Sequence, residues 1–262
     1  MNQKAVGILF LLAVVFLAAG PRLDILRTDV LNTFQGCSPE HLLGTDHLGR
    51  DVYSLMAEGA FRTLTVVGLA CAISLFAGTL LGMTAAYAGR TVRSAIQLCS
   101  DLTLIIPSFI CALIFSALFG FGPITAGIVF GIGNLGAYVN QAQALTERLK
   151  SRGFIEAETV LGAGRSRVIF SHILPNIFRQ LLIFLGNKAG NVTLQYAGLA
   201  FIGLGTDVTN PDWGTLLYQY RAYIFTCPRL ILCPAAAICL LALWFHVMFD
   251  SRTQRERGTI YD

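Results

Sequence analysis

Residues 64–87 read LTVVGLACAISLFAGTLLGMTAAY, an apolar block long enough to decide the class of fold. A helix that spans a bilayer needs about 20 mostly apolar residues, and lipid offers the backbone no hydrogen-bonding partners. Over the whole chain, 55% of the residues are hydrophobic and 13% are charged, against roughly 25% charged in a soluble domain. The sequence therefore predicts an all-α polytopic membrane protein and excludes an ordinary soluble domain.

Five further apolar blocks lie on either side of this one, so the sequence predicts about six transmembrane helices. They cover residues 5–19, 95–119, 124–144, 177–204 and 230–249. The first block is short, and the small residues at its end would also suit a signal-peptide cleavage site. We expect an uncleaved anchor instead, because an even number of helices returns both ends of the chain to the same side.

This pattern divides the chain into two parts. Residues 1–61 are expected to hold the first transmembrane helix and an external segment, and residues 62–262 a five-helix core with a cytoplasmic loop at residues 146–175. No internal repeat is evident.

The lysines and arginines stand at the ends of the apolar blocks, which is a signal of topology rather than of nucleic-acid binding. With the amino terminus inside, the larger set is cytoplasmic: Lys4, Arg90, Arg93, Arg148, Lys150, Arg152, Arg165, Arg167, Arg179, Arg252, Arg255 and Arg257. The smaller, external set is Arg22, Arg27, Arg50, Arg62, Arg221 and Arg229, and Lys188 lies within a span. Both termini are therefore predicted to be cytoplasmic.

Neither the cysteines nor the histidines form a catalytic or metal-binding pattern. Five of the seven cysteines lie in apolar blocks, no C-x-x-C occurs, and we predict no metal site. Cys37 and Cys227 fall in external segments, and a disulfide between them is left open. The four histidines are scattered and no H-E-x-x-H or G-x-S-x-G is present, so an intramembrane enzyme is not expected. A secondary transporter or a channel subunit stays open as an alternative transport function.

The loop between the fourth and fifth blocks contains a short amphipathic segment. Residues 154–161 can form a helix that ends at the flexible Gly162 and Gly164. Its apolar side chains Ile155, Val160 and Leu161 can fill a groove on a partner protein. An ordinary amphipathic surface loop accounts for the same residues equally well.

Polar side chains recur on one helical face of the fifth block and, more weakly, of the fourth. They are Asn187, Lys188, Asn191 and Gln195, then Asn134 and Tyr138. Polar groups inside a membrane usually face the bundle interior or water, so these residues can line a translocation path. Hydrogen bonding between helices, with Lys188 reaching toward the cytoplasm, explains them equally well.

The external segment contains the turn-rich sequence GTDHLGRD at residues 44–51. Asp46 can cap the start of a helix, and Arg50 can pair with Asp46 or Asp51. Of a substrate contact and a self-capped turn that holds the loop together, we favour the turn.

Three segments resemble one family of transport proteins. In the loop, Glu156, Ala157, Gly162, Leu174 and Pro175 match the pattern E-A-A, three residues, G, nine residues, I-x-L-P of binding-protein-dependent ABC importers. Glu158 departs from the second alanine and His172 from the isoleucine. The external motif, with Gly44, Thr45, Asp46, Gly49, Arg50 and Asp51, is similar to the G-T-D-x-x-G-R-D of the second permease subunit in dipeptide, oligopeptide and nickel importers. GLAFIGLG at residues 198–205 and PDWG at residues 211–214 resemble the same subunits.

The resemblance implies the permease architecture of a type I ABC importer in the cytoplasmic (inner) membrane of a prokaryote. Its partners would be a second permease chain, two cytoplasmic ATPases and an external substrate-binding protein. The coupling helix would comprise Ile155, Glu156, Ala157, Val160, Leu161, Gly162, Ala163 and Gly164. The chain has no phosphate-binding loop, so ATP and Mg would be bound by the ATPases and this chain would carry no cofactor. The cargo would be dipeptides, oligopeptides, nickel or a metal chelate, and we favour peptides.

Overall fold

The computed structural model describes residues 28–204 and 209–258, together with Gly7, Ile8, Phe10, Leu12, Ala13, Leu17, Ile25 and Leu26. At Glu156, Thr159 and residues 250–258 it describes the backbone alone. Most of the first apolar block lies outside these residues, so the expected anchor stays a prediction. The described residues form helices and no strand, which confirms the all-α class.

The helices from α2 to α9 follow one another along the chain with short connections, whereas longer segments precede α2 and α10. In order they are η1 (Val30–Asn32), α2 (Val52–Tyr87), α3 (Arg90–Ile105), α4 (Ser108–Phe119), α5 (Pro123–Gly133), α6 (Leu135–Lys150), α7 (Gly153–Val160), α8 (Arg165–Arg167), η2 (Val168–Ile173), α9 (Leu174–Phe201), α10 (Trp213–Tyr220), η3 (Arg221–Tyr223) and α11 (Arg229–Gly258).

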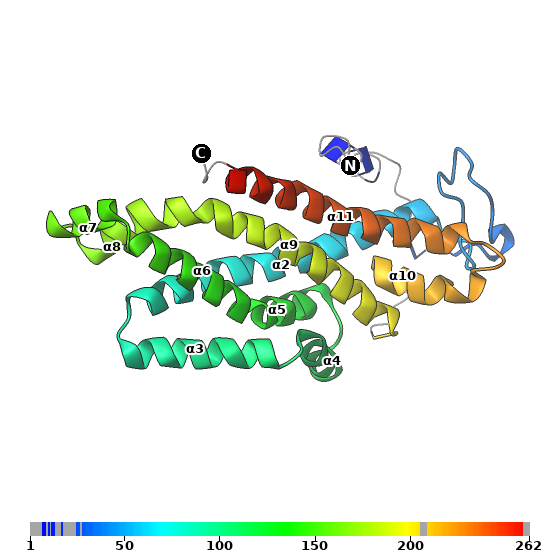
Figure 1. Ribbon diagram of the computed structural model, residues 1–262. Helices are drawn as coiled ribbons and strands as arrows, with labels where there is room; N and C mark the ends of the chain where they lie inside the picture. Colours follow the sequence, from blue (N-terminus) through cyan, green and yellow to red (C-terminus); the bar gives the residue numbers. More distant parts are fainter. Residues whose placement is uncertain are drawn as a thin grey trace.

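The molecule is elongated, with α2, α9 and α11 running along its length (Figure 1). Helix α2 packs against α5, α6 and α9, and α11 packs along α9. The short helix α7 lies at one end of the molecule and α10 at the other. We call these the α7 end and the α10 end.

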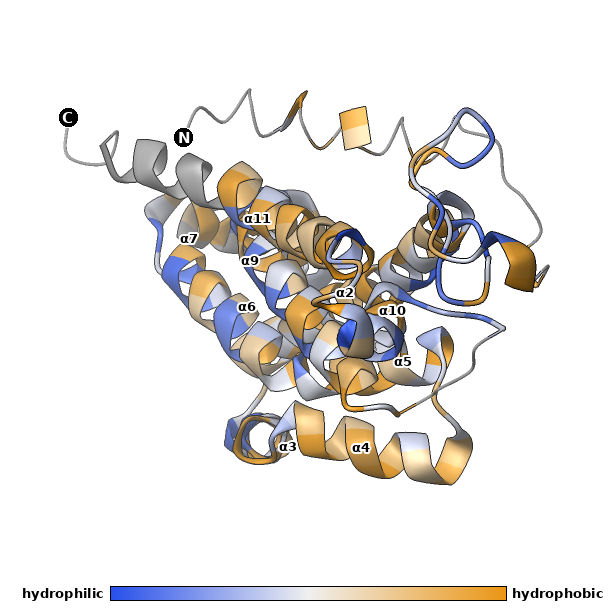
Figure 2. Cartoon of the chain, turned by 90° about the vertical axis from the view of Figure 1, so that its right-hand side faces the viewer, coloured by the Kyte–Doolittle hydropathy of each residue, from blue (hydrophilic) through white to orange (hydrophobic). Residues whose placement is uncertain are grey.

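Among the described residues, three unbroken helices are long and apolar enough to cross a membrane: Val52–Tyr87, Arg165–Phe201 and Arg229–Phe249. The predicted third span is α3 and α4, which meet at an angle of 82°, so that α4 turns away from α3 (Figure 2). Pro107 explains the bend, because proline disfavours the helical conformation in the residue before it. The predicted fourth span is broken at Asn134 into α5 and α6. The expected count of six is therefore not confirmed.

Helix α2 begins at Val52, whereas the sequence placed its apolar block at residues 64–87 and the start of the core at residue 62. The Asp51 carboxylate accepts a hydrogen bond from the Ser54 N–H at 2.8 Å and caps the helix. At 1.5 Å per residue, the 36 residues of α2 extend about 54 Å, well beyond a hydrocarbon core of about 30 Å. The first turns of α2 consequently belong to the structure at the α10 end.

The fifth block also begins earlier than predicted, because α8, η2 and α9 form one continuous helical run from Arg165 to Phe201. The run contains a π-helical segment, Val168–Ile173. Pro175 follows directly, and its ring lacks the N–H that would bond the carbonyl of Ser171. The wider π turn accommodates this missing hydrogen bond, and Pro175 lies in the first turn of α9.

Glycines allow α2 to approach α6 closely. A Cβ atom at Gly78 would lie 2.4 Å from the Cβ of Tyr138, and one at Gly82 would lie 2.5 Å from the carbonyl oxygen of Val139. In lipid, no hydrophobic effect drives helices together, so their association depends on close packing. Small residues permit this packing because they let two helix backbones approach each other. The contact therefore depends on the absence of a side chain at both positions.

We expect Gly82→Ala to lower the stability of the folded chain by about 1–3 kcal/mol, because the added methyl group would overlap the backbone of α6. The matched control is Gly68→Ala in the same helix, where a Cβ would meet no atom within 4 Å. Alanine should there be neutral or stabilise by up to about 1 kcal/mol through its helix propensity. Thermal unfolding of the two purified variants distinguishes these outcomes, and equal Tm values would contradict the expectation.

Candidate functional site

The α7 end is organised as a short helix followed by a glycine turn. Helix α7 ends at Val160, and Gly162 adopts a φ of +87° that favours glycine. The N–H of Ala163 then donates to the carbonyl of Glu158 at 3.0 Å, and Gly164 precedes α8. The short helix predicted at residues 154–161 and its glycine ending are therefore present.

The two faces of this helix differ sharply in exposure. Ile155 is 2% exposed and belongs to a buried apolar cluster with Leu145, Ile173 and other side chains of α6, η2 and α9. Val160 and Leu161 are 87% and 82% exposed, and Ala157 is also exposed. The prediction that Ile155 fills a partner's groove is therefore wrong, because this side chain anchors α7 to its own chain. Val160 and Leu161 stay available to a partner.

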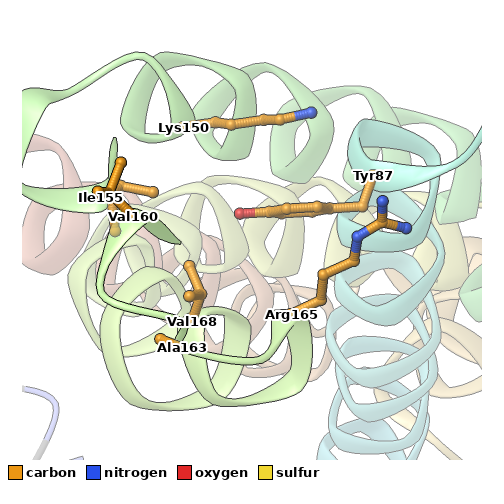
Figure 3. Close-up of a pocket in the computed structure, with 7 residues that line it drawn as sticks. All are labelled: Tyr87, Lys150, Ile155, Val160, Ala163, Arg165 and Val168. Atoms are coloured by element: carbon orange, nitrogen blue, oxygen red, sulfur yellow. The ribbon is translucent and has the colours of Figure 1, made fainter. Parts of the chain in front are cut away.

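A cavity of about 590 Å³ separates α7 from the ends of α2 and α6 (Figure 3). Its walls are Tyr87, Lys150, Ile155, Val160, Ala163, Arg165 and Val168. The Lys150 Nζ donates to the carbonyl of Ala86 at 3.3 Å and lies 4.7 Å from the centroid of the Tyr87 ring. Two cations and an aromatic ring thus border the base of α7.

The two positions that depart from the family pattern face each other. The Glu158 Oε2 lies 3.9 Å from the His172 Nε2, so a protonated His172 would pair with this carboxylate. The structure describes no side chain for Glu156, the glutamate that matches the pattern.

At the α10 end, the external motif forms a buried ion pair. The Arg50 guanidinium contacts the Asp46 carboxylate at 2.8 Å, and the two side chains are 2% and 0% exposed. Asp46 also accepts hydrogen bonds from the N–H groups of Leu48 and Arg50 and from the Tyr220 hydroxyl. Arg50 donates to the Gln219 side chain at 3.0 Å. The ion pair therefore joins the external segment to α10.

The remaining motif residues shape the turn and start α2. Gly44 and Gly49 have φ values of +75° and +72°, and Thr45 is buried and pairs with Asp51 in an isolated β-bridge. Asp51, rather than Asp46 as proposed, caps the helix, because Asp46 is fully occupied by the turn and by Arg50.

The PDWG segment docks α10 onto two long helices. Asp212 caps α10 and accepts a hydrogen bond from the Tyr196 hydroxyl of α9 at 2.9 Å. The Trp213 Nε1 donates to the carbonyl of Met56 in α2 at 2.9 Å. This segment and the external motif, far apart in the sequence, thus build one folded unit.

Cys37 and Cys227 both carry free thiols in this structure.

A polar cavity of about 310 Å³ lies between these ends, where α3 bends into α4 and α5 breaks into α6. Its lining includes the bend at Pro107 and Ser108, then Asn134, Lys188 and Gln195. The Ser108 hydroxyl donates to the Gln195 side-chain oxygen at 3.2 Å. Two breaks in the helical backbone therefore meet the polar face of α9.

The structure brings only some of the predicted path residues to this cavity. Asn191 is exposed, one turn from Lys188 and Gln195 on the same face of α9, and Asn187 does not line the cavity. Tyr138 is fully buried and packs edge-on against Phe184 with ring centroids 5.0 Å apart. We therefore place Tyr138 in the core, because Gly78 of α2 leaves the space in which Tyr138 packs.

Sequence reasoning missed the residues at Pro107 and Ser108, and the partners of the external motif, Gln219 and Tyr220. Pro107 offered a signal, because a proline within an apolar block breaks the helix there. Gln219 and Tyr220 offered none, since they contact Asp46 and Arg50 only through the tertiary fold.

Comparison with known proteins identifies the class of this chain. Residues 78–255, more than half of the chain, match the family described as binding-protein-dependent transport system inner membrane component. The chain belongs to this family. It is thus a permease subunit of an ABC importer in the cytoplasmic membrane, which decides against the secondary transporter and the channel.

Relatives with assigned functions agree with this membership over most of their length. The chain is 32% identical to a dipeptide transport system permease protein of Alkalihalophilus pseudofirmus, over 92% of this chain and 79% of the relative. It is 32% identical to a di/tripeptide transport system permease protein of Pseudomonas aeruginosa, over 95% and 86%. A nickel transport system permease protein of Escherichia coli is 28% identical, over 81% and 76%.

Arg50→Met should destabilise the chain by about 3–5 kcal/mol, because the substitution leaves the Asp46 carboxylate buried without its counterion. We expect the Tm of the purified chain to fall by roughly 10 °C. The control is Arg221→Met in the adjoining η3, where the arginine is exposed and its loss should change stability by about 0.5 kcal/mol or less. A similar Tm for both variants would count against the buried ion pair as a structural element.

The folded unit at the α10 end should also lose stability at low pH through His47. Burial lowers the pKa of His47, Arg50 lowers it further, and Asp46 opposes both. The unfolded chain then binds a proton at His47 near pH 6.5 while the folded chain does not, so stability is complete above about pH 6.5 and falls below it. We expect Tm to decrease more steeply between about pH 7 and pH 5 in the wild type than in His47→Gln. Parallel curves for the two proteins would refute this.

Proposed function

We propose that this permease couples ATP hydrolysis by separate subunits to the import of short peptides. Its partners would be a second permease chain, two cytoplasmic ATPase subunits and an external substrate-binding protein, with lipid around the helices. ATP and Mg would be bound by the ATPase subunits, and we propose no cofactor for this chain.

The observation that carries the proposal is the unequal exposure of α7. Val160 and Leu161 are large apolar side chains with more than four-fifths of their surface exposed, on a helix that Ile155 anchors to the core. An apolar projection on a firmly held base is the geometry expected of a helix that fits a groove in a partner. We assign this partner as an ATPase subunit, and α7 with the turn at Gly162 as the coupling helix.

Movement of α7 has a physical route into the membrane part. Ile155 packs in one apolar cluster with Ile173, Ile177 and Leu181, and the last two lie on α9. The same helix carries Lys188 and Gln195 to the polar cavity. Because packed side chains transmit strain through a dense core, a displacement of α7 by the ATPase would shift the wall of this cavity.

We propose the cavity as part of the translocation path. Non-helical backbone at membrane depth is tolerated only where protein covers it or where it lines a water-filled space. The breaks at Pro107 and Asn134 both line this cavity, and Asn191 lies exposed on the same face of α9. The second permease chain would supply the opposite wall.

The charge distribution supports an orientation with the α7 end in the cytoplasm. Arg148, Lys150, Arg152, Arg165 and Arg167 all lie at or next to this end, as expected for cytoplasmic segments. Both termini would then be cytoplasmic. The α10 end would face the outside and receive the cargo from the binding protein.

The names of relatives include dipeptides, di/tripeptides and nickel among the transported cargo. For this chain we propose short peptides.

Replacing Leu161 by Asp tests the coupling assignment. The charge should prevent Leu161 from entering an apolar groove, and loss of a central interface residue weakens binding by 2 kcal/mol or more, which is about 30-fold. We expect the ATPase subunits that co-purify with the tagged chain in mild detergent to fall accordingly, while the second permease is retained.

The control is Phe225→Asp, which introduces the same charge at an exposed apolar residue near the α10 end. This variant should retain the ATPase subunits at the wild-type level. Equal retention in Leu161→Asp and Phe225→Asp would rule out α7 as the ATPase contact.

A further inference from the structure

Lys188 is a cation in the middle of a membrane-spanning helix. It lies 14 residues after Leu174 and 13 before Phe201, the two ends of α9, so about 20 Å of helix separates it from either end. A residue near the middle of a spanning helix lies within the hydrocarbon core, which is about 30 Å thick. Its charge therefore has to be accommodated at membrane depth, where charged groups face a bundle interior or water.

The structure gives this charge no counterion within the described part of the chain. No described carboxylate lies within 4.0 Å of the Lys188 Nζ, in contrast to Arg50 and Arg93, which each pair with one at 2.8 Å. Its described contact is the Phe184 ring, with the Nζ 5.5 Å from the centroid. A cation over an aromatic ring is stabilised only in part, so the site still favours a negative charge from elsewhere.

The groups around Lys188 suit a carboxylate. Asn134 and Gln195 line the same cavity with neutral amides, and Ser108 contributes a hydroxyl. Because the Ser108 hydroxyl already donates to the Gln195 side-chain oxygen, the donors beside the ammonium group are amide N–H groups, which bind a carboxylate through charge-assisted hydrogen bonds. A bare divalent metal ion would be repelled by Lys188, and the described residues contain no group of three His, Cys, Asp or Glu side chains able to hold one.

We propose that Lys188 is the fixed positive charge of the path and that it favours cargo with a free carboxylate, such as the C-terminus of a short peptide, over a bare divalent cation. This inference rests on the proposed function of the cavity as part of the translocation path. It specifies the charge of the cargo. The names of the relatives do not, because they include both peptides and nickel.

The test uses the whole importer, purified through this chain with its partner subunits, reconstituted in liposomes and supplied with its binding protein. The probes are a labelled dipeptide with a free C-terminal carboxylate and Ni²⁺ alone. Uptake is measured per assembled complex in the wild type and in Lys188→Gln, Lys188→Glu and Lys188→Arg. Loss of a hydrogen bond to a charged group should slow dipeptide uptake about tenfold or more in Lys188→Gln. Lys188→Glu should be slower still, and Lys188→Arg should stay within about twofold of the wild type.

The control is Arg179→Gln, which removes the same charge from an exposed position on the same helix and should leave dipeptide uptake unchanged. Dipeptide uptake by Lys188→Gln at the wild-type rate would overturn the inference while leaving the importer intact. So would uptake of Ni²⁺ without uptake of the dipeptide in the wild type. Absence of the ATPase subunits from the purified complex, or uptake of neither probe, would instead contradict the proposed function itself.

Discussion

In hydrocarbon, a backbone N–H or C=O group without an internal partner is destabilised by several kcal/mol, because no water is present to bind it. Long stretches of this chain obey that constraint as unbroken helices, above all α2 and the run from Arg165 to Phe201. The interruptions at Pro107 and Asn134 are therefore informative. Both fall at one polar cavity, where side chains and water can satisfy the freed groups, so the same constraint that forms the bundle also locates its polar interior.

The two ends of the molecule use burial in opposite ways. At the α10 end, Asp46 and Arg50 are buried and satisfied by α10, and Trp213 and Asp212 secure that helix to α2 and α9. At the α7 end, one face of a short helix is buried and the other is left exposed. The ion pair gives the α10 end a fixed shape, and the exposed face of α7 is the surface that we propose for a partner.

Two cations inside the fold, the buried Arg50 and the half-buried Lys188, differ in their partners. Arg50 has its counterion and hydrogen-bond partners within the described fold, so its charge serves to hold the external segment against α10 in one arrangement, a role that hydrophobic packing specifies less well. Lys188 lies in a polar cavity without a described counterion. The two charges differ in whether the described part of the fold supplies a counterion, and composition does not reveal this difference.

The sequence by itself determined the all-α class, the approximate places of the apolar segments from residue 64 onward, the amphipathic helix before Gly162 and the family. The class and the helices follow from apolar block length and local spacing, which depend on neighbours within a few turns. The family follows from the resemblance of three motifs. Only the tertiary structure decided that Ile155 is an anchor, that Tyr138 is core and that Asp51 rather than Asp46 caps α2. It also decided that Lys188, Asn134 and Pro107 line one cavity. Each of these depends on which residues distant in the chain pack together. The helical period predicts which residues share a face, but it does not predict what that face contacts.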